Sequence, residues 1–248
     1  MLLKNKVCIV TGAGKGFGRD IAKAYYTQGA KLALITRSQT DVDDLISTFD
    51  DDGRVLSVCG DVSDTVVVSQ FVSQVVNKFG MIDVLVNNAG IRFRKEFLDI
   101  SNEELDQVLN VNLKSVFYLC QEVLPYMIEK NSGKIINMSS IAGTLGFANL
   151  SGYVMSKAAI IGLTKSLAVE FANKNIQINA LAPGFCKTSY FRSFQDNKEL
   201  YNFTLSRIPM NRWGESKEIA DVCVFLASSM SNYMTGEVLK VDGGWSAG

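Results

Sequence analysis

Short apolar runs rich in β-branched residues recur along the whole chain, and longer stretches of helical period separate them. The runs are VCIV (7–10), KLALI (31–35), VLSV (55–58), VLVN (84–87), KIINM (134–138), IQINAL (176–181) and VLKV (238–241). Strands that are buried on both faces have this continuous apolar character, and parallel strands need a helical crossover between them. The clearest intervening helices are expected from about 103 to 128 and from about 151 to 172. The pattern predicts an α/β fold with a mainly parallel seven-stranded sheet covered by helices on both faces.

The alternation continues to the end of the chain without a linker, repeat or low-complexity segment. A chain of 248 residues with 47% hydrophobic content suits one well-packed domain, so we expect a single domain over 1–248. Lysine plus arginine and aspartate plus glutamate both number 25. This balance gives no global field toward nucleic acid or a membrane surface, and we expect neither as a partner.

Two further features indicate a cytoplasmic protein. The start MLLKNK lacks the longer apolar stretch of a signal peptide, and no apolar run approaches the roughly 18 residues of a membrane span. The five cysteines, at 8, 59, 120, 186 and 223, form no CxxC pair and have the distribution of reduced, mostly buried residues.

The chain contains no histidine. This absence removes the commonest general base, every Ser-His-Asp or Cys-His triad and the usual zinc ligand set, so no metal site is expected. Any catalysis must use other groups.

A glycine-rich loop, TGAGKGFG, follows the first strand at 11–18 and leads into a helix that begins near Gly16. Free backbone N–H groups at the positive end of a helix can hold a pyrophosphate, provided that no side chain blocks the approach. The spacing departs from G-x-G-x-x-G and lacks the ending of a P-loop, so the loop alone does not separate a dinucleotide site from a plain glycine-rich turn. A Rossmann-type, doubly wound sheet places such a loop at its carboxyl edge.

The end of the second strand bears on the choice of cofactor. In this architecture the residue there meets the adenosine ribose, and here it is Thr36, followed by Arg37. An acidic residue would bind the 2'-hydroxyl of NAD, whereas Arg37 and Lys15 offer two cations for the 2'-phosphate of NADP. The alternative is that both are ordinary surface charges. We predict NADP(H) as the cofactor.

The segment SGYVMSK (151–157) carries the candidate acid–base pair. Tyr153 and Lys157 are four residues apart on a predicted helix and share one face. A tyrosine with a reference pKa of about 10 is a poor acid near neutrality, but an adjacent ammonium favours its phenolate and lowers that pKa. Amphipathic helices often contain such pairs, so the pair indicates catalysis only together with other catalytic residues. Ser140, at the end of the strand 134–138, can donate a hydrogen bond to a substrate carbonyl.

These features occur in the order typical of the short-chain dehydrogenase/reductase family, which the chain resembles over nearly its full length. The matching segments are TGAGKGFG, GDV (60–62), NNAG (87–90), NVN (110–112), Ser140, Tyr153 with Lys157, PG (183–184) and VDGGW (241–245). The resemblance implies a catalytic tetrad of Asn112, Ser140, Tyr153 and Lys157. Ser139 is the neighbouring alternative, but the family's thirteen-residue spacing from serine to tyrosine selects Ser140.

The resemblance also implies the roles. Tyr153 would donate the proton when hydride passes from reduced nicotinamide to a ketone, Ser140 would hold the carbonyl oxygen, Lys157 would tune the tyrosine and bind the ribose, and Asn112 would carry a water chain. Asp61 would accept from the adenine, unless it only caps the following helix, and Asn88 would line the cofactor passage, unless it only ties strand ends together. The full cofactor-binding set is Gly12, Gly14, Lys15, Gly16, Phe17, Gly18, Thr36, Arg37, Asp61, Val62, Asn88, Ala89, Gly90, Tyr153, Lys157, Pro183, Gly184, Cys186 and Thr188.

The substrate is less constrained. The aromatic-rich segment 186–213 should form the substrate lid. The overall pattern is similar to 3-oxoacyl-acyl-carrier-protein reductases. In this chain Lys174 occupies the position where such enzymes often carry a basic residue that binds the carrier. Its partner position is the neutral Asn131, which weakens this interpretation. RIPMNRWGE, VDGGW and GIRFRKEF instead resemble reductases of keto-sugar acids, and Arg92 or Arg94 could grip a carboxylate. Arg92, Arg94 and Lys95 could equally be a solvated charge run. A third alternative is a dinucleotide-binding regulator without turnover.

The family resemblance further implies a homo-oligomer, with a tetramer expected. One two-fold interface would use about 217–227 with 238–241, and the other would use the long helices around 103–128 and 152–172. The apolar faces of these helices motivate the expectation.

Overall fold

All seven apolar runs are strands of one parallel sheet. The computed structural model describes residues 1–49, 53–188 and 191–248. The strands are β1 (Val7–Thr11), β2 (Lys31–Thr36), β3 (Val55–Cys59), β4 (Val84–Asn87), β5 (Gly133–Met138), β6 (Ile176–Pro183) and β9 (Val238–Val241), in the spatial order β3-β2-β1-β4-β5-β6-β9. The chain builds outward from β1 to β3 and then returns to place β4 on the other side of β1. This reversal leaves a crevice at the carboxyl ends of β1 and β4, where such sheets bind ligands.

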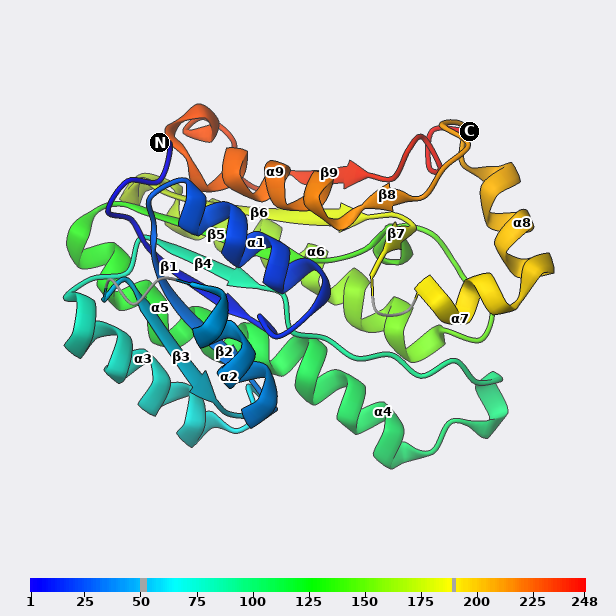
Figure 1. Cartoon of the computed structure of the whole chain (residues 1–248), viewed down its shortest axis with the longest axis horizontal. Helices are drawn as coiled ribbons and strands as arrows, with labels where there is room; N and C mark the ends of the chain where they lie inside the picture. The colour runs from blue at the N-terminus through cyan, green and yellow to red at the C-terminus, as the bar shows by residue number, and fades with distance from the viewer. Residues whose placement is uncertain (50–52, 189–190) are drawn as a thin grey trace.

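Helices cover both faces of the sheet (Figure 1). One apolar core lies between the sheet and α1 (Gly16–Thr27), α2 (Gln39–Thr48) and α9 (Ser216–Ala227). A second lies between the opposite face and α3 (Thr65–Phe79), α5 (Ser115–Lys130) and α6 (Ser151–Phe171). The predicted Rossmann-type, doubly wound architecture is therefore confirmed.

The helix predicted over 103–128 is interrupted. It consists of α4 (Asn102–Leu109), a π-helical turn η2 (Asn110–Lys114) and α5, which contains Pro125. The wider turn accommodates one extra residue, a feature often found at functional sites. Asn112, one of the predicted site residues, lies within this turn and is fully buried.

The segment predicted to form the lid lies beyond the carboxyl edge of the sheet (Figure 1). It contains β7 (Cys186–Lys187), α7 (Phe191–Asp196) and α8 (Lys198–Arg207), and it is followed by β8 (Gly214–Glu215), which pairs with β7. Positions 189 and 190 of the predicted lid lie outside the described residues. A third apolar cluster holds the segment in place, with Ile141, Phe194, Ile208, Trp213 and Trp245 at its centre.

Short helical turns complete the connections, namely η1 (Phe97–Asp99), η3 (Ile141–Gly143), η4 (Ala172–Lys174) and η5 (Ser229–Ser231). Within the described ranges, none of the helices combines the length and the apolar character that crossing a membrane requires.

A buried carboxylate ties the amino ends of β1 and β4 together. The side chain of Asp83 is 4% exposed, accepts a 2.8 Å hydrogen bond from the Val7 N–H and contacts the ammonium groups of Lys6 and Lys130. Burial alone would raise the pKa of Asp83, but the bonds from Lys130 and Val7 and the charge of Lys6 outweigh it and hold the pKa below its ordinary value. Asp83 therefore stabilises the fold as an anion.

Candidate active site

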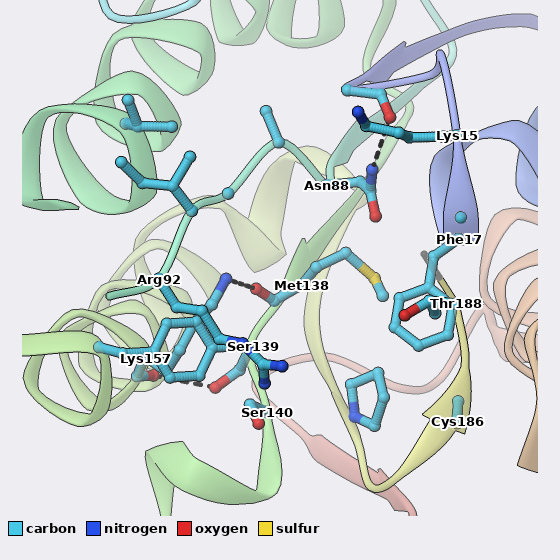
Figure 2. A pocket seen from close by; sticks show the side chains of 18 of the residues that line it. Lys15, Phe17, Asn88, Arg92, Met138, Ser139, Ser140, Lys157, Cys186 and Thr188 are labelled. Carbon is cyan, nitrogen blue, oxygen red and sulfur yellow. Dashed lines mark hydrogen bonds between the residues drawn. The ribbon is translucent and has the colours of Figure 1, made fainter. Parts of the chain in front are cut away.

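A cleft of about 410 Å³ opens at the carboxyl ends of the central strands (Figure 2). It brings together most of the predicted site residues from segments far apart in the chain. The predicted residues that line it are Gly12, Gly14, Lys15, Gly16, Phe17, Thr36, Arg37, Val62, Asn88, Ala89, Gly90, Ser140, Tyr153, Lys157, Pro183, Gly184, Cys186 and Thr188. Gly18, Asp61 and Asn112 are the predicted residues that do not line it.

The glycine loop is packed so tightly that side chains are excluded from it. Gly12 has a φ of +63°, and a Cβ built on it would lie 2.9 Å from the Cα of Ala89. A Cβ on Gly18 would lie 2.2 Å from the carbonyl oxygen of Gly12. Asn88 fixes the same turn, because its amide donates to the carbonyl oxygens of Thr11 at 2.9 Å and Gly12 at 3.2 Å (Figure 2). Gly18 thus shapes the cradle from beneath rather than by facing the cleft.

The end of β2 combines cations with a carboxylate that the sequence did not single out. Lys15 and Arg37 are exposed and line the cleft, as predicted. Asp41, in the first turn of α2, also lines it. The hydroxyl of Thr36 donates to the Asp41 carboxylate at 3.2 Å, and a Cβ on Gly14 would lie 2.4 Å from a carboxylate oxygen of Asp41. This corner therefore presents both charges to a ribose.

Asp61 is engaged in a local turn. One of its carboxylate oxygens accepts from the N–H of Ser63 at 2.9 Å and from its hydroxyl at 2.7 Å. The cap of α3 is Asp64, whose side chain accepts from Val66 and Val67, so Asp61 does not cap that helix. Its neighbour Val62 is buried and lines the cleft.

Tyr153 and Lys157 lie together on the first two turns of α6. The Nζ of Lys157 is 5.7 Å from the centre of the Tyr153 ring and donates a 2.7 Å hydrogen bond to the Met138 carbonyl (Figure 2). Lys157 is only 4% exposed, and this burial lowers its pKa from 10.5 to about 8. Gly90 lies beside this ammonium, because a Cβ built on it would be 3.5 Å from the same Nζ, an ordinary van der Waals contact.

The two neighbouring serines have different surroundings. The Ser139 hydroxyl is buried and donates to the backbone carbonyl of Lys157 at 2.9 Å, which fixes α6 against the end of β5 (Figure 2). The Ser140 hydroxyl caps the turn η3 by accepting from the Ala142 N–H at 3.1 Å, and its own proton can be donated elsewhere. Ser140 is the better placed of the two to meet a ligand in the cleft.

Asn112 acts from behind the cleft wall. Its Oδ1 accepts from the N–H of Ile91 at 2.8 Å, and its Nδ2 donates to the Ile91 carbonyl at 2.9 Å and to the Ser156 hydroxyl at 3.0 Å. These bonds join the segment after Gly90 to α6. The π-helical turn places the amide where it can make all three.

Aromatic and cationic side chains line the part of the cleft near the tetrad positions. Phe185 lies 5.2 Å from Trp213 between ring centres, and both line the cleft. Arg92 points into the cleft on the side of Ser140 and Lys157, with its guanidinium 5.7 Å from the ring of Phe194 (Figure 2). Arg94 lines the cleft as well. Partial burial, together with the charge of Arg92, lowers the pKa of Arg94. Lys95 instead pairs with Glu104.

The residues present fit a dinucleotide. The cradle offers bare backbone at the start of α1, and the cleft continues from the end of β2 past Asn88 and Gly90 to Tyr153. Among the described residues, no group of three or more histidine, cysteine or acidic side chains is arranged to hold a metal ion.

Comparison with known proteins agrees with this geometry. The family model described as Enoyl-(Acyl carrier protein) reductase matches residues 12–246. The 3-oxoacyl-(acyl-carrier-protein) reductase FabG of Thermotoga maritima is 40% identical over 245 residues, which cover 98% of this chain and 99% of that protein. The chain belongs to the short-chain dehydrogenase/reductase family. It is therefore an oxidoreductase of the nicotinamide-dependent kind.

Other members of the family are similar in sequence and structure. The 2-dehydro-3-deoxy-D-gluconate 5-dehydrogenase of Bacillus subtilis is 38% identical over 244 residues, covering 98% of this chain and 95% of that protein. A gluconate 5-dehydrogenase from Burkholderia cenocepacia, solved with NADP and tartrate, superposes with a TM-score of 0.94 at 32% identity, covering 99% of this chain and 97% of that one.

Two predicted surface features lie away from the cleft. Lys174 is exposed at the end of η4, and the next residue, Asn175, donates its amide to the Asn131 carbonyl at 3.2 Å. On the helices predicted to form an interface, Phe117 is 44%, Met155 45% and Val169 84% exposed.

Proposed function

We propose that the chain is an NADP(H)-dependent oxidoreductase that transfers hydride between nicotinamide and a ketone or secondary alcohol, with Asn112, Ser140, Tyr153 and Lys157 as its working residues. The observation that carries the proposal is the buried Lys157 ammonium, 5.7 Å from the Tyr153 ring at the wall of an open cleft. A buried, cationic partner is what a tyrosine requires to act as an acid near neutrality.

In the proposed mechanism, the glycine loop, Lys15 and Arg37 would hold NADPH, which would supply the hydride for the carbonyl carbon. The Ser140 hydroxyl donates to the carbonyl oxygen and so fixes its position. Tyr153 gives its phenolic proton to that oxygen as negative charge develops on it. Lys157 stabilises the resulting phenolate. Asn112 keeps the segment after Gly90 in register with α6. In this mechanism a water chain held by Asn112 would return the proton to Tyr153.

NADP is the proposed cofactor in preference to NAD. Lys15 and Arg37 stand at the cleft corner where the 2'-phosphate would lie, and each charge-assisted contact contributes about 1.5–3 kcal/mol. The Burkholderia cenocepacia relative was solved with NADP. The Asp41 carboxylate at the same corner would repel the 2'-phosphate. The preference for NADP therefore depends on how far attraction by the two cations exceeds this repulsion.

The proposed substrate is an anionic ketone. Arg92 and Arg94 both line the cleft, and the one acidic residue among its described lining is Asp41, which lies at the end of β2. The name of the Bacillus subtilis relative states 2-dehydro-3-deoxy-D-gluconate, which is the anion of a keto acid. An acyl carrier is the second candidate. The 40% identity to FabG and the exposed Lys174 favour it, and the neutral Asn131 at the partner position is the point against it.

The proposal extends to the setting of the enzyme. We place it in the cytoplasm, because its five cysteines are free. We propose a homotetramer, because apolar side chains of α5 and α6 are exposed in one chain and a second copy would cover them.

NADPH oxidation with a panel of acyl thioesters, keto-sugar acids and cyclic ketones tests the function. Tyr153→Phe should leave NADPH binding nearly unchanged and abolish turnover, whereas Tyr233→Phe, at a fully exposed tyrosine, should behave as the unmodified protein. Appreciable turnover by Tyr153→Phe would contradict the assignment. NADPH binding without turnover on any substrate would favour the regulator.

Arg94→Ala, assayed on a keto acid and on its uncharged ester, tests the substrate class. A selective loss of kcat/KM for the acid is expected, with Lys95→Ala as the matched control because Lys95 pairs with Glu104. Equal effects on acid and ester would favour the acyl-carrier candidate.

A further inference from the structure

A second cavity, of about 420 Å³, lies beside the active-site cleft under the lid. It shares Arg94, Phe147, Phe185 and Phe194 with the cleft, so the two spaces have a common wall. Its other lining residues come from the loop after η3, from α8 and from the carboxyl-terminal turn, and they are Leu145, Gly146, Ala148, Leu200, Phe203, Thr204, Arg207 and Trp245. Nothing in the tetrad mechanism uses this space.

The lining of this second cavity is chemically selective. Most of it is aromatic or aliphatic, and the one hydroxyl, that of Thr204, is already used: it accepts from the Trp213 indole at 2.9 Å and donates to the Tyr201 carbonyl at 2.7 Å. A polyhydroxylated ligand would therefore find few hydrogen-bond partners there, and its hydroxyls would lose those made with water. An apolar ligand would lose nothing.

The charge of the second cavity is entirely positive. Arg94 and Arg207 line it, and no carboxylate does. Within the described ranges neither arginine forms an ion pair, and the Arg207 guanidinium lies 5.4 Å from the centre of the Trp245 ring. Two guanidinium groups at the edge of an apolar space favour a ligand that ends in an anion.

The second cavity shares a wall with the cleft, so a substrate longer than its reacting ketone can extend from the cleft toward it. We propose that the second cavity receives the apolar body and terminal carboxylate of an elongated keto acid, with the carboxylate held by Arg94 and Arg207. This inference rests on the proposed function for the ketone end. It narrows the substrate class to apolar acids and away from sugar acids.

Direct binding tests the proposal without turnover. Decanoate, decyltrimethylammonium and gluconate are titrated into the full-length protein, with and without NADP⁺, by calorimetry and by tryptophan fluorescence, since Trp245 lines the cavity. Decanoate should bind saturably, and the cation of equal chain length and gluconate should each bind at least about tenfold more weakly.

Two variants address the charge and the wall separately. Arg207→Glu should weaken decanoate at least about tenfold. Phe203→Ser, at a side chain that is 55% exposed and so dispensable for folding, should weaken it several-fold. Lys198→Glu is the matched control, because it reverses a charge on the same helix outside the cavity.

The proposal is overturned if decanoate does not bind, if Lys198→Glu weakens it as much as Arg207→Glu, or if gluconate or decyltrimethylammonium binds equally well. Turnover of the uncharged ketone cyclohexanone, measured in parallel on the unmodified enzyme, reports on the catalytic residues alone. Turnover without decanoate binding would refute the second cavity and leave the proposed function standing. Decanoate binding without turnover of any ketone would refute the proposed function and leave the second cavity standing as a binding site.

Discussion

Replacing Lys157 by methionine should make the protein more stable while it removes catalysis. The ammonium is 4% exposed, and burial lowers its pKa from 10.5 to about 8. A difference of that size corresponds to about 3 kcal/mol by which the folded state disfavours the charged form. Methionine has a similar length and no charge, so Lys157→Met removes this cost.

The gain is reduced by one lost hydrogen bond. Lys157 donates to the Met138 carbonyl at 2.7 Å, and leaving that acceptor without a donor costs about 1 kcal/mol. The net expectation is about 2 kcal/mol of added stability at pH 7. For a chain of this size, that is a rise in Tm of about 4–8 °C.

The pH dependence identifies the cause. Below about pH 8 lysine is charged in both the folded and the unfolded state, so the unmodified protein carries the full cost. Between about 8 and 10.5 the folded state releases its proton first, and the stability of the unmodified protein rises with pH. The advantage of Lys157→Met should therefore be largest below pH 8 and vanish near pH 10.5.

Thermal unfolding of the cofactor-free protein at pH 7 and pH 10, at one fixed protein concentration, measures the effect. Lys217→Met, at a lysine that is 78% exposed, is the control and should show no gain. A Tm for Lys157→Met below that of the unmodified protein at pH 7, or a difference that does not change with pH, would refute the reasoning.

Three further predictions use other parts of the structure. Arg37→Asp should shift the ratio of NADPH to NADH affinity about tenfold toward NADH, and Asp41→Asn should shift it about tenfold toward NADPH. Calorimetric titrations measure both shifts, and equal affinities in the unmodified protein would contradict both predictions. Asp83→Asn should cost about 2 kcal/mol at pH 7. Because the folded pKa of Asp83 is lowered, this loss should shrink as pH falls through that pKa, which a series of chemical unfolding curves from pH 7 downward measures. Light scattering at micromolar concentration should give a tetrameric mass, and a monomeric mass would disprove the interface.

The strands and the cradle could be predicted because they depend on local signals. Buried parallel strands have continuous apolar sequences. At Gly18 only glycine fits, because a Cβ there would lie 2.2 Å from the carbonyl oxygen of Gly12. The pairing of Tyr153 with Lys157 follows from helical spacing alone. The tetrad roles remain predictions until the variants are assayed.

The remaining features depend on tertiary contacts. The carboxylate of Asp41 reaches Thr36 because of how the first turn of α2 returns to β2, and no spacing rule encodes that return. The difference between Ser139 and Ser140 lies in a bond from Ser139 to a carbonyl eighteen residues away. The second cavity is lined by several segments distant in sequence, so apolar composition alone could indicate a lid but not a second space beneath it.

The π-helical turn at Asn110–Lys114 lies between α4 and α5, which follow one another as one long helix, and it changes the direction in which the side chains of α5 face relative to those of α4. Each residue of a regular helix advances the facing direction by about 100°, so one extra residue rotates everything after it by that angle. Deleting Leu113 would therefore give a straight helix in which either the α4 half or the α5 half faces the wrong partner. The turn therefore sets the rotation of α5 relative to α4. A redesign that replaced it with regular α-helix would produce a well-formed helix in which the Asn112 amide no longer faces Ile91.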